Sequence, residues 1–195
     1  GCNPPVIGIT SAATVAGGVV YVGGGNAYWD ALNATTGAIL WQVYTGDNSQ
    51  AGAHYNWSSP LILNGYAYIG VASNCDNPLV QGQVLQVSLT THQIINTFDF
   101  VPNGQVGGGA WTSPTYDPVT NSIFLTSATQ NQVSQNLAEA IVALDPATLT
   151  LKSYWQVPFS QKGNDSDWGT TPTLFTDTNG TRYIAASNKD GILYA

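Results

Sequence analysis

The sequence predicts an all-β protein from its composition, its hairpin signals and a segment that recurs along the chain. Only 8% of the 195 residues are Asp, Glu, Lys or Arg, whereas Gly, Asn, Ser and Thr are abundant. This composition is typical of many short strands joined by tight turns and not of surface helices. Turn pairs such as Asn64-Gly65 and Asn179-Gly180 lie beside apolar-aromatic stretches, which indicates hairpins. The predicted second strands of these hairpins cover residues 19–22, 66–69, 122–125 and 182–185.

The segment Ala31–Trp41 is the clearest copy of the repeat. It predicts a strand, a tight turn and a returning strand that ends in tryptophan. Residues 86–92 keep the strand and the threonine, residues 143–148 keep an Ala-x-Asp-x-x-Thr core, and a fourth copy would begin at Ala195. The spacing is near the roughly 40 to 45 residues of a propeller blade, so we expect a radial repeat instead of a single compact core.

The start of each unit can be aligned as well, and the alignment defines the blades. The predicted first strands are Thr10-Ser11-Ala12-Ala13, Trp57-Ser58-Ser59-Pro60, Trp111-Thr112-Ser113-Pro114 and Gly169-Thr170-Thr171-Pro172, offset by 47, 54 and 58 residues. We predict that residues 1–195 are part of a single β-propeller domain with four-stranded antiparallel blades. The expected blades are about 9–46, 57–100, 111–158 and, incomplete, 168–195. About four blades of an eight-bladed ring would be covered, and the remaining blades of the same propeller should complete it.

Charge and cysteine content narrow the function classes. The formal net charge is −7, from eleven acidic and four basic residues, so no basic face is expected and nucleic acid is not an expected partner. The covered region has no apolar run of the roughly 20 residues needed for a membrane span. Cys2 and Cys75 lack metal-binding spacing, which leaves a disulfide or two buried thiols, and we favour the disulfide. A disulfide would place the protein outside a reducing cytoplasm.

The repeat carries a family resemblance. The Ala-x-Asn-x-x-Thr-Gly-x-x-x-Trp pattern of residues 31–41, with the Ser-Pro first strands, resembles the tryptophan-docking repeat of the quinoprotein alcohol dehydrogenases. These are β-propellers that hold pyrroloquinoline quinone (PQQ), and the resemblance is closest to the polyvinyl-alcohol dehydrogenase branch. It implies an extracytoplasmic enzyme, secreted or periplasmic, that oxidises a small-molecule or polymer alcohol. It also implies that Trp41 packs between blades and belongs to no site.

Blades two and three depart from that pattern. Asn96 and Ser153 stand in place of the final tryptophan, and His92 and Leu149 stand in place of the glycine. We therefore expect an incomplete girdle of docking tryptophans.

The first candidate site residues are aromatic. The first strand of each blade lines the channel of a propeller, so residues near its start converge from several blades. Trp111 follows the glycine run 107–109, which lets the backbone pass close to a flat ligand. The resemblance implies that Trp111 forms the floor of the quinone pocket, and we add Gly109 and Trp57 as cofactor-binding candidates. The alternative is that Trp111, like Trp57 and Trp168, fills the channel.

Asp167 is the candidate catalytic residue. Its segment resembles the Asp-Phe-Gly or Asp-Trp-Gly turn that carries the catalytic aspartate of the family. Oxidation of an alcohol needs a base that takes the hydroxyl proton while hydride leaves the carbon, and partial burial raises the pKa of a carboxylate toward that role. The alternatives are an Asx-turn or a solvated loop, and Asp165 is a competing candidate.

Lys189 is the candidate electrostatic residue. It matches the Lys or Arg that precedes a Gly-x-x-Tyr strand in the family and contacts quinone oxygens there. A cation suits an anionic cofactor and the negative charge that develops during hydride transfer. A surface turn lysine is the alternative.

The expected calcium ligands are missing. In the family a glutamate and an asparagine hold calcium beside the quinone, and here these positions fall on Cys75 and Thr129, with Asp76 and Asn131 nearby. Three alternatives stay open: Asp76 and Asn131 hold the metal, the pocket binds quinone without metal, or the site has decayed into scaffold. The second function hypothesis follows from the last of these, namely a non-catalytic propeller that serves as a binding or scaffold module at the cell surface or in the periplasm.

Overall fold

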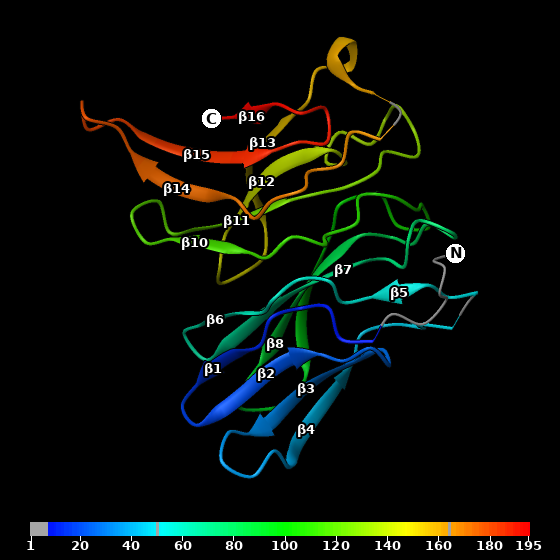
Figure 1. Cartoon of the computed structure of the whole chain (residues 1–195), viewed down its shortest axis with the longest axis vertical. Coiled ribbons are helices and arrows are strands. Elements are labelled where there is room, and N and C mark those ends of the chain that lie inside the picture. Colours follow the sequence, from blue (N-terminus) through cyan, green and yellow to red (C-terminus); the bar gives the residue numbers. More distant parts are fainter. Residues whose placement is uncertain (1–7, 50, 164) are drawn as a thin grey trace.

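The computed structural model describes residues 8–49, 51–163 and 165–195, which form antiparallel sheets (Figure 1). There are four sheets in this part of the chain, each of them one blade, and their strands pair in chain order except that β5 and β6 both pair with β7. Apart from a short 3-10 turn, η1 (Phe159–Gln161), the described residues contain no helix. The prediction of an all-β propeller with four-stranded antiparallel blades is confirmed.

The first two blades have the following strands. Blade one contains β1 (Thr14–Ala16), β2 (Val19–Gly23), β3 (Tyr28–Asn33) and β4 (Ile39–Tyr44). Blade two contains β6 (Leu61–Leu63), β7 (Tyr66–Ser73), β8 (Gln83–Ser88) and β9 (Ile94–Asp99), with β5 (His54–Tyr55) paired to the end of β7.

The last two blades follow the same order. Blade three contains β10 (Thr115–Asp117), β11 (Ser122–Thr126), β12 (Ala140–Leu144) and β13 (Leu151–Gln156). Blade four contains β14 (Thr173–Thr176), β15 (Arg182–Ser187) and β16 (Leu193–Tyr194) within the described residues. The hairpin strands predicted at 19–22, 66–69, 122–125 and 182–185 are confirmed as β2, β7, β11 and β15.

The predicted first strands are wrong in their bounds, because the segments ending at Ala13, Pro60, Pro114 and Pro172 come before β1, β6, β10 and β14. In the first three of these segments, one backbone N–H donates to a hydroxyl of the next blade. The backbone N–H of Ala12 donates to Ser59 Oγ at 3.0 Å, and that of Ser59 donates to Ser113 Oγ at 2.9 Å. The N–H of Ser113 donates in turn to Thr171 Oγ1 at 3.2 Å. This hydroxyl ladder (Ser59, Ser113 and Thr171) joins consecutive blades at positions that the repeat aligned.

Apolar cores lie between the blades. Blades one and two bury Trp29, which is stacked on Tyr21 at 5.5 Å between ring centroids, against Ile69. Blades two and three bury Tyr68 and Ile123 in a second cluster, with the members Tyr68, Val84, Phe100, Ala110, Ile123, Leu125, Ala140, Val142, Leu144 and Leu149. The third interface has a smaller cluster of Val157, Trp168 and Ala186. Apolar side chains from neighbouring blades are therefore buried against each other, as in other repeat folds.

Trp41 docks one blade onto the next, as expected. Its ring stacks on His92, which lies in the turn of blade two, with 4.5 Å between centroids and an interplanar angle of 13°. Trp41 also contacts Trp29 and Tyr21. The residue that replaces the family's glycine is therefore the partner of the tryptophan.

At the next interface, hydrogen bonds replace the missing tryptophan. Asn96 stands in its place and donates through Nδ2 to Gln86 Oε1 at 2.6 Å. Gln86 Nε2 donates to the carbonyl oxygen of Pro146, in the turn of blade three, at 2.9 Å, and the Tyr68 hydroxyl donates to the same oxygen. Gln86 is fully buried. A polar network thus joins blades two and three where an indole joins blades one and two.

The two ends of the sheets differ. Antiparallel pairing places the connections 24–27, 74–82, 127–139 and 188–192 at one end, together with the inter-blade segments 45–60, 100–114 and 157–172. We call this the site end, and the opposite end, with turns such as 34–38, the turn end. Within the described residues, no helix is long and apolar enough to cross a membrane.

Candidate functional site

A pocket of about 200 Å³ opens at the site end. Its lining comes from three blades, as expected for a site near a propeller axis. The lining residues are Trp57, Ala72, Ser73, Cys75, Asp76, Gly109, Trp111, Ala128, Asp167 and Lys189. The pocket therefore brings together six of the candidate site residues named from the sequence: Trp57, Asp76, Gly109, Trp111, Asp167 and Lys189.

Asp167 is the most enclosed acid of this pocket, with 3% of its surface exposed. Its Oδ1 accepts hydrogen bonds from the backbone N–H and the hydroxyl of Thr129, and the hydroxyl distance is 2.8 Å. Its Oδ2 lies 2.8 Å from Lys189 Nζ. A carboxylate has about four lone-pair sites, so these three contacts leave one of them for a further donor.

Lys189 is the cation of the pocket. Its Nζ contacts Asp167 and also both oxygens of Asp165, at 2.9 and 3.0 Å. Burial by itself would lower the pKa of Lys189, but the hydrogen bonds to Asp167 and Asp165 outweigh it, so the pKa is raised and the ammonium stays charged. Backbone pairing positions the residue, because the N–H of Lys189 donates to the carbonyl oxygen of Asp167 at 2.9 Å.

The two candidate acids differ in environment. The side chain of Asp165 is 60% exposed, whereas that of Asp167 is 4% exposed. The hydrogen bond from Lys189 lowers the pKa of Asp165, which keeps it ionised. Asp165 lies outside the pocket lining, so the geometry favours Asp167 as the acid that faces a bound molecule.

Two indoles supply the apolar walls. Trp111 lies beneath Lys189, whose Nζ is 5.9 Å from the ring centroid, within the range of a cation–π contact. Trp57 is fixed by its Nε1–H, which donates to the carbonyl oxygen of Ser73 at 2.9 Å, and by a tilted contact with Tyr55. Trp168 is different, because it is fully buried against Trp155 and Tyr194 and belongs to the core between blades three and four.

Gly109 also lines the pocket, and the reason for its glycine is local packing. A Cβ at this position would lie 3.0 Å from Ala72 Cβ, on β7. The close approach of the 100–114 segment to β7 therefore favours a residue without a side chain. Gly109 positions the backbone that leads to Trp111.

Thr129 is a residue whose role the sequence analysis missed. It appeared there only at the position of a lost metal ligand, but it holds Asp167 and also contacts Asp76, with 3.2 Å between Thr129 Oγ1 and Asp76 Oδ2. Burial, and then the negative charge of Asp167, raises the pKa of Asp76. The spacing from Trp111 was the signal that could have identified Thr129 as a site residue.

The calcium hypothesis fits these residues poorly. Calcium takes roughly six to eight oxygen ligands. Asp76 lines the pocket, but Asn131 is not part of the lining, and its backbone N–H donates to Gln135 Oε1. The described residues contain no group of three or more His, Cys, Asp and Glu side chains that could hold a metal ion, and Lys189 already contacts Asp167. No step proposed below depends on calcium.

The chemistry of the pocket does fit a planar anion such as PQQ. Two indole faces and an ammonium lie around one cavity, and indoles and cations are the groups that contact a flat, negatively charged ring system. Cys75 is part of this lining, whereas Cys2 lies outside the described residues. The Cys2–Cys75 disulfide stays a prediction.

Comparison with known proteins supports the resemblance inferred from the sequence. A polyvinylalcohol dehydrogenase from Pseudomonas sp. is 24% identical over 85% of this chain. Among solved structures, the quinohemoprotein alcohol dehydrogenase ADHIIG from Pseudomonas putida HK5 superposes with a TM-score of 0.75, at 22% identity over 93% of the chain. BamB from Moraxella catarrhalis gives a TM-score of 0.61, at 19% identity over 95% of the chain. The chain is thus similar to PQQ-type propellers, and the fold is shared with a protein of another kind.

The chain spans only part of these relatives. It covers 32% of the Pseudomonas dehydrogenase sequence, 32% of the ADHIIG chain and 45% of the BamB chain. No family model matches the sequence. The substrates of these relatives therefore enter only into the proposed function of this chain.

Proposed function

We propose that this chain is part of an extracytoplasmic quinoprotein-like oxidoreductase that oxidises an alcohol with PQQ. The observation that carries the proposal is the meeting of Trp57, Trp111, Lys189 and Asp167 around one pocket. The similarity to a polyvinylalcohol dehydrogenase and to quinohemoprotein alcohol dehydrogenases supports it. The substrate class is an alcohol, small or polymeric.

Asp167 acts as the base in this proposal. The donors on Thr129 and Lys189 fix both of its oxygens, and the remaining lone-pair site accepts the proton of the substrate hydroxyl. The Lys189 ammonium stabilises negative charge that develops beside it, and its contact with Trp111 keeps it at the indole face. Bound PQQ would supply the acceptor for the hydride that leaves the alcohol carbon.

The test uses the complete protein of which this chain is part. Titration with PQQ, with and without calcium, is followed by quenching of tryptophan fluorescence, and activity by dye-linked oxidation of ethanol and of polyvinyl alcohol. We expect saturable quenching that weakens in Trp111→Ala. Asp167→Asn should lower the oxidation rate by roughly 100- to 10,000-fold, the usual contribution of a general base, while quenching by PQQ persists.

Asp30→Asn is the matched control. Asp30 lies on β3 and accepts a hydrogen bond from Gln42 Nε2 at 2.7 Å, outside the pocket lining. Its substitution should leave both the rate and the quenching unchanged. Absence of PQQ binding together with absence of alcohol oxidation in the wild-type protein would overturn the proposal.

The alternative is a non-catalytic propeller that binds or scaffolds other molecules. One observation favours it: Lys189, Asp165 and Asp167 satisfy one another, so the cluster holds the loops together without a ligand. In that case Asp167→Asn and Lys189→Met would lower the free energy of unfolding. The wild-type protein would neither bind PQQ nor oxidise an alcohol.

A further inference from the structure

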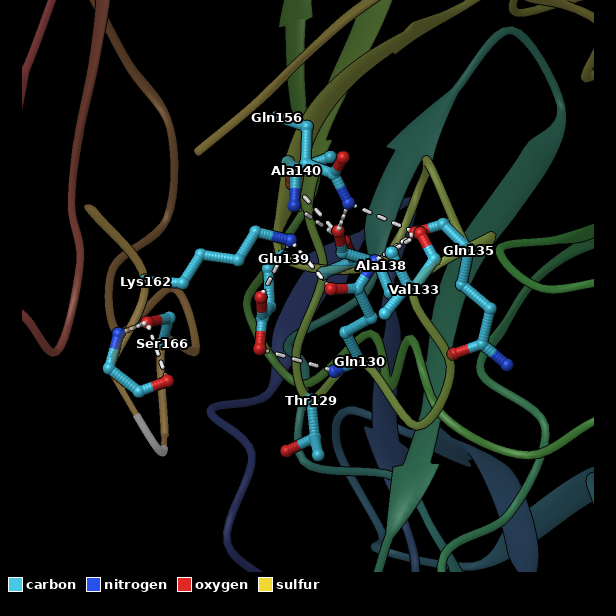
Figure 2. A network of polar contacts seen from close by, with 12 residues as sticks. Thr129, Gln130, Val133, Gln135, Ala138, Glu139, Ala140, Gln156, Lys162 and Ser166 are labelled. Carbon is cyan, nitrogen blue, oxygen red and sulfur yellow. Dashed lines mark hydrogen bonds and ion pairs between the residues drawn. The ribbon is translucent and has the colours of Figure 1, made fainter. Parts of the chain in front are cut away.

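A second ion pair lies next to the pocket, and neither of its side chains is part of the lining. Lys162 Nζ is 3.0 Å from Glu139 Oε2, and each side chain is 8% exposed. The same ammonium donates to Gln130 Oε1 at 2.8 Å, and Glu139 Oε1 accepts from the backbone N–H of Gln130 at 3.3 Å (Figure 2). We call Gln130, Glu139 and Lys162 the clamp. Burial of two charges is costly, so such a pair needs an explanation beyond general stability.

The clamp joins two segments that carry the pocket's acid. Gln130 and Glu139 belong to the 127–139 loop, which contains Thr129, and Lys162 belongs to the inter-blade segment 157–172, which contains Asp167. Thr129 and Gln130 are neighbours, so one loop holds the returning segment at two points, at Asp167 and at Lys162.

Two of the residues between these points, Gly163 and Ser166, are joined by a hydrogen bond. The backbone N–H of Gly163 donates to Ser166 Oγ at 2.7 Å, and Ser166 is 1% exposed. The carbonyl oxygen of Ser166 accepts from Asn188 Nδ2 at 2.7 Å, which ties Ser166 to the connection that carries Lys189. The residue after Lys162 is therefore hydrogen-bonded to the residue before Asp167.

The loop side of the clamp is equally well tied. Gln130 Nε2 donates to the carbonyl oxygens of Val133 and Gln135, and Gln156 Nε2 donates to those of Gln135 and Ala138 (Figure 2). Glu139 itself has a positive φ of 52°, which is strained for a residue with a side chain. The loop thus holds Glu139 in a costly conformation that presents its carboxylate to Lys162.

We propose that the clamp is a positioning device that sets Asp167 for proton transfer by fixing Lys162 against Gln130 and Glu139. Its catalytic meaning rests on the proposed function, whereas the positioning can be measured without PQQ. The device acts through Thr129, whose N–H and hydroxyl direct the carboxylate of Asp167.

The test is amide hydrogen exchange of the complete protein with residue resolution. The reporter is the N–H of Thr129, which donates to Asp167 Oδ1 and touches no clamp side chain. Lys162→Met should accelerate its exchange by about tenfold or more, while amides in the strands of blades one and two keep their protection. The double variant Lys162→Met/Glu139→Gln removes the clamp without leaving an unpaired buried charge, so it is expected to fold and to show the same acceleration.

Lys152→Met is the matched control, because Lys152 Nζ bonds the carbonyl oxygens of Thr120 and Asn121 at the turn end. It should leave the exchange of Thr129 unchanged. Unchanged exchange at Thr129 in both clamp variants would overturn the proposal. Equal acceleration across the whole chain would overturn it too, because that result indicates a general loss of stability.

Turnover gives a second, independent readout. Lys162→Met should lower kcat by about tenfold or more with little change in KM, as expected for misplacement of a catalytic group. In an Asp167→Asn background the same substitution should have no further effect, and equal losses in both backgrounds would contradict a role through Asp167. If the wild-type protein showed no oxidation activity, the proposed function would be overturned. The amide exchange of Thr129 would still decide whether the clamp positions Asp167.

Discussion

The two ends of the sheets are built by different rules. At the turn end, residues 34–38, 89–93 and 146–150 repeat one hydrogen-bonding pattern in three blades. The side chains of Asn33, Ser88 and Asp145 each accept hydrogen bonds from two backbone N–H groups that follow them. At the site end, the connections 24–27, 74–82 and 127–139 differ in length.

This difference shows where the repeat acts. Gly37, His92 and Leu149 occupy the same turn position, and all have a positive φ, of 72°, 59° and 55°. The turn conformation is therefore kept in blades two and three, where glycine is replaced. Both replacing residues pack at a blade interface, His92 on Trp41 and Leu149 in the core between blades two and three. The loops at the site end do not repeat this turn. They carry Asp76, Thr129 and the other groups of the pocket.

Removing the core of the first blade interface should have the largest effect on stability. Trp29→Ala removes a fully buried indole that contacts Tyr21 and Trp41. We expect the free energy of unfolding to fall by about 3–5 kcal/mol, measured by denaturant titration. Trp29→Phe is the control and should cost much less, because Trp29 Nε1 has no hydrogen-bond partner in the described part of the chain. If Trp29→Ala also changed the exchange of Thr129 in the folded protein, the first blade interface and the pocket would not be independent.

The link between blades three and four should make stability depend on pH. Burial would raise the pKa of Asp117, but hydrogen bonds from Thr120 and Arg182 outweigh it and lower the pKa to about 2. Because the pKa of Asp117 is lower in the folded protein than in the unfolded chain, where it is about 4, the ionised group stabilises the fold at pH values above about 4. This stabilisation is lost as the pH falls from about 4 toward 2.

The expected contribution is about 2 kcal/mol at neutral pH. It is measured as the change in unfolding free energy between pH 6 and pH 2, in the wild type and in Asp117→Asn. The variant should lack this part of the acid dependence. An identical acid dependence in both proteins would contradict the assignment to Asp117.

The hydroxyl ladder should contribute less. Ser113→Ala removes the acceptor for the N–H of Ser59 and should lower the free energy of unfolding by about 1 kcal/mol, the usual net value of one hydrogen bond. Ser113→Thr keeps the hydroxyl and serves as the control. A loss in the threonine variant as large as that in the alanine variant would show that packing, and not the hydrogen bond, is responsible.

The turn of blade two should give the smallest effect. His92→Ala removes the stacking on Trp41 and keeps the positive φ, so we expect a loss of about 0.5–1 kcal/mol. His92→Gly removes the stacking but relieves the backbone, so its loss should be smaller still. If glycine were the more destabilising of the two, the backbone at this turn would not be under strain. Thermal unfolding followed by circular dichroism distinguishes the two variants.

Much of the fold could be predicted because its signals are local and repeated. The strands β2, β7, β11 and β15 were found from alternation and from turn pairs such as Asn64-Gly65. The segment Trp57–Pro60 was predicted as strand, but the hydrogen bond of Ser59 goes to Ser113 of the next blade, and a single sequence gives no sign of that partner.

The candidate site was predicted through the resemblance more than through local chemistry. Trp111, Asp167 and Lys189 were named from motifs, and the structure brings them to one pocket. The pairing of Thr129 with Asp167 and the clamp at Lys162 went unnoticed, because these contacts join loops far apart in the sequence and of irregular length.

The sequence by itself determined the all-β class and the blade repeat, because strand alternation, turn residues and spacing depend on neighbours in the chain. The docking role of Trp41 followed from the family resemblance of that repeat. Only the tertiary structure decided that Asp167, and not Asp165, lies buried beside Thr129 and Lys189. The physical reason is that burial and pairing of charges depend on which loops meet at the end of the sheets, and no local pattern encodes that meeting.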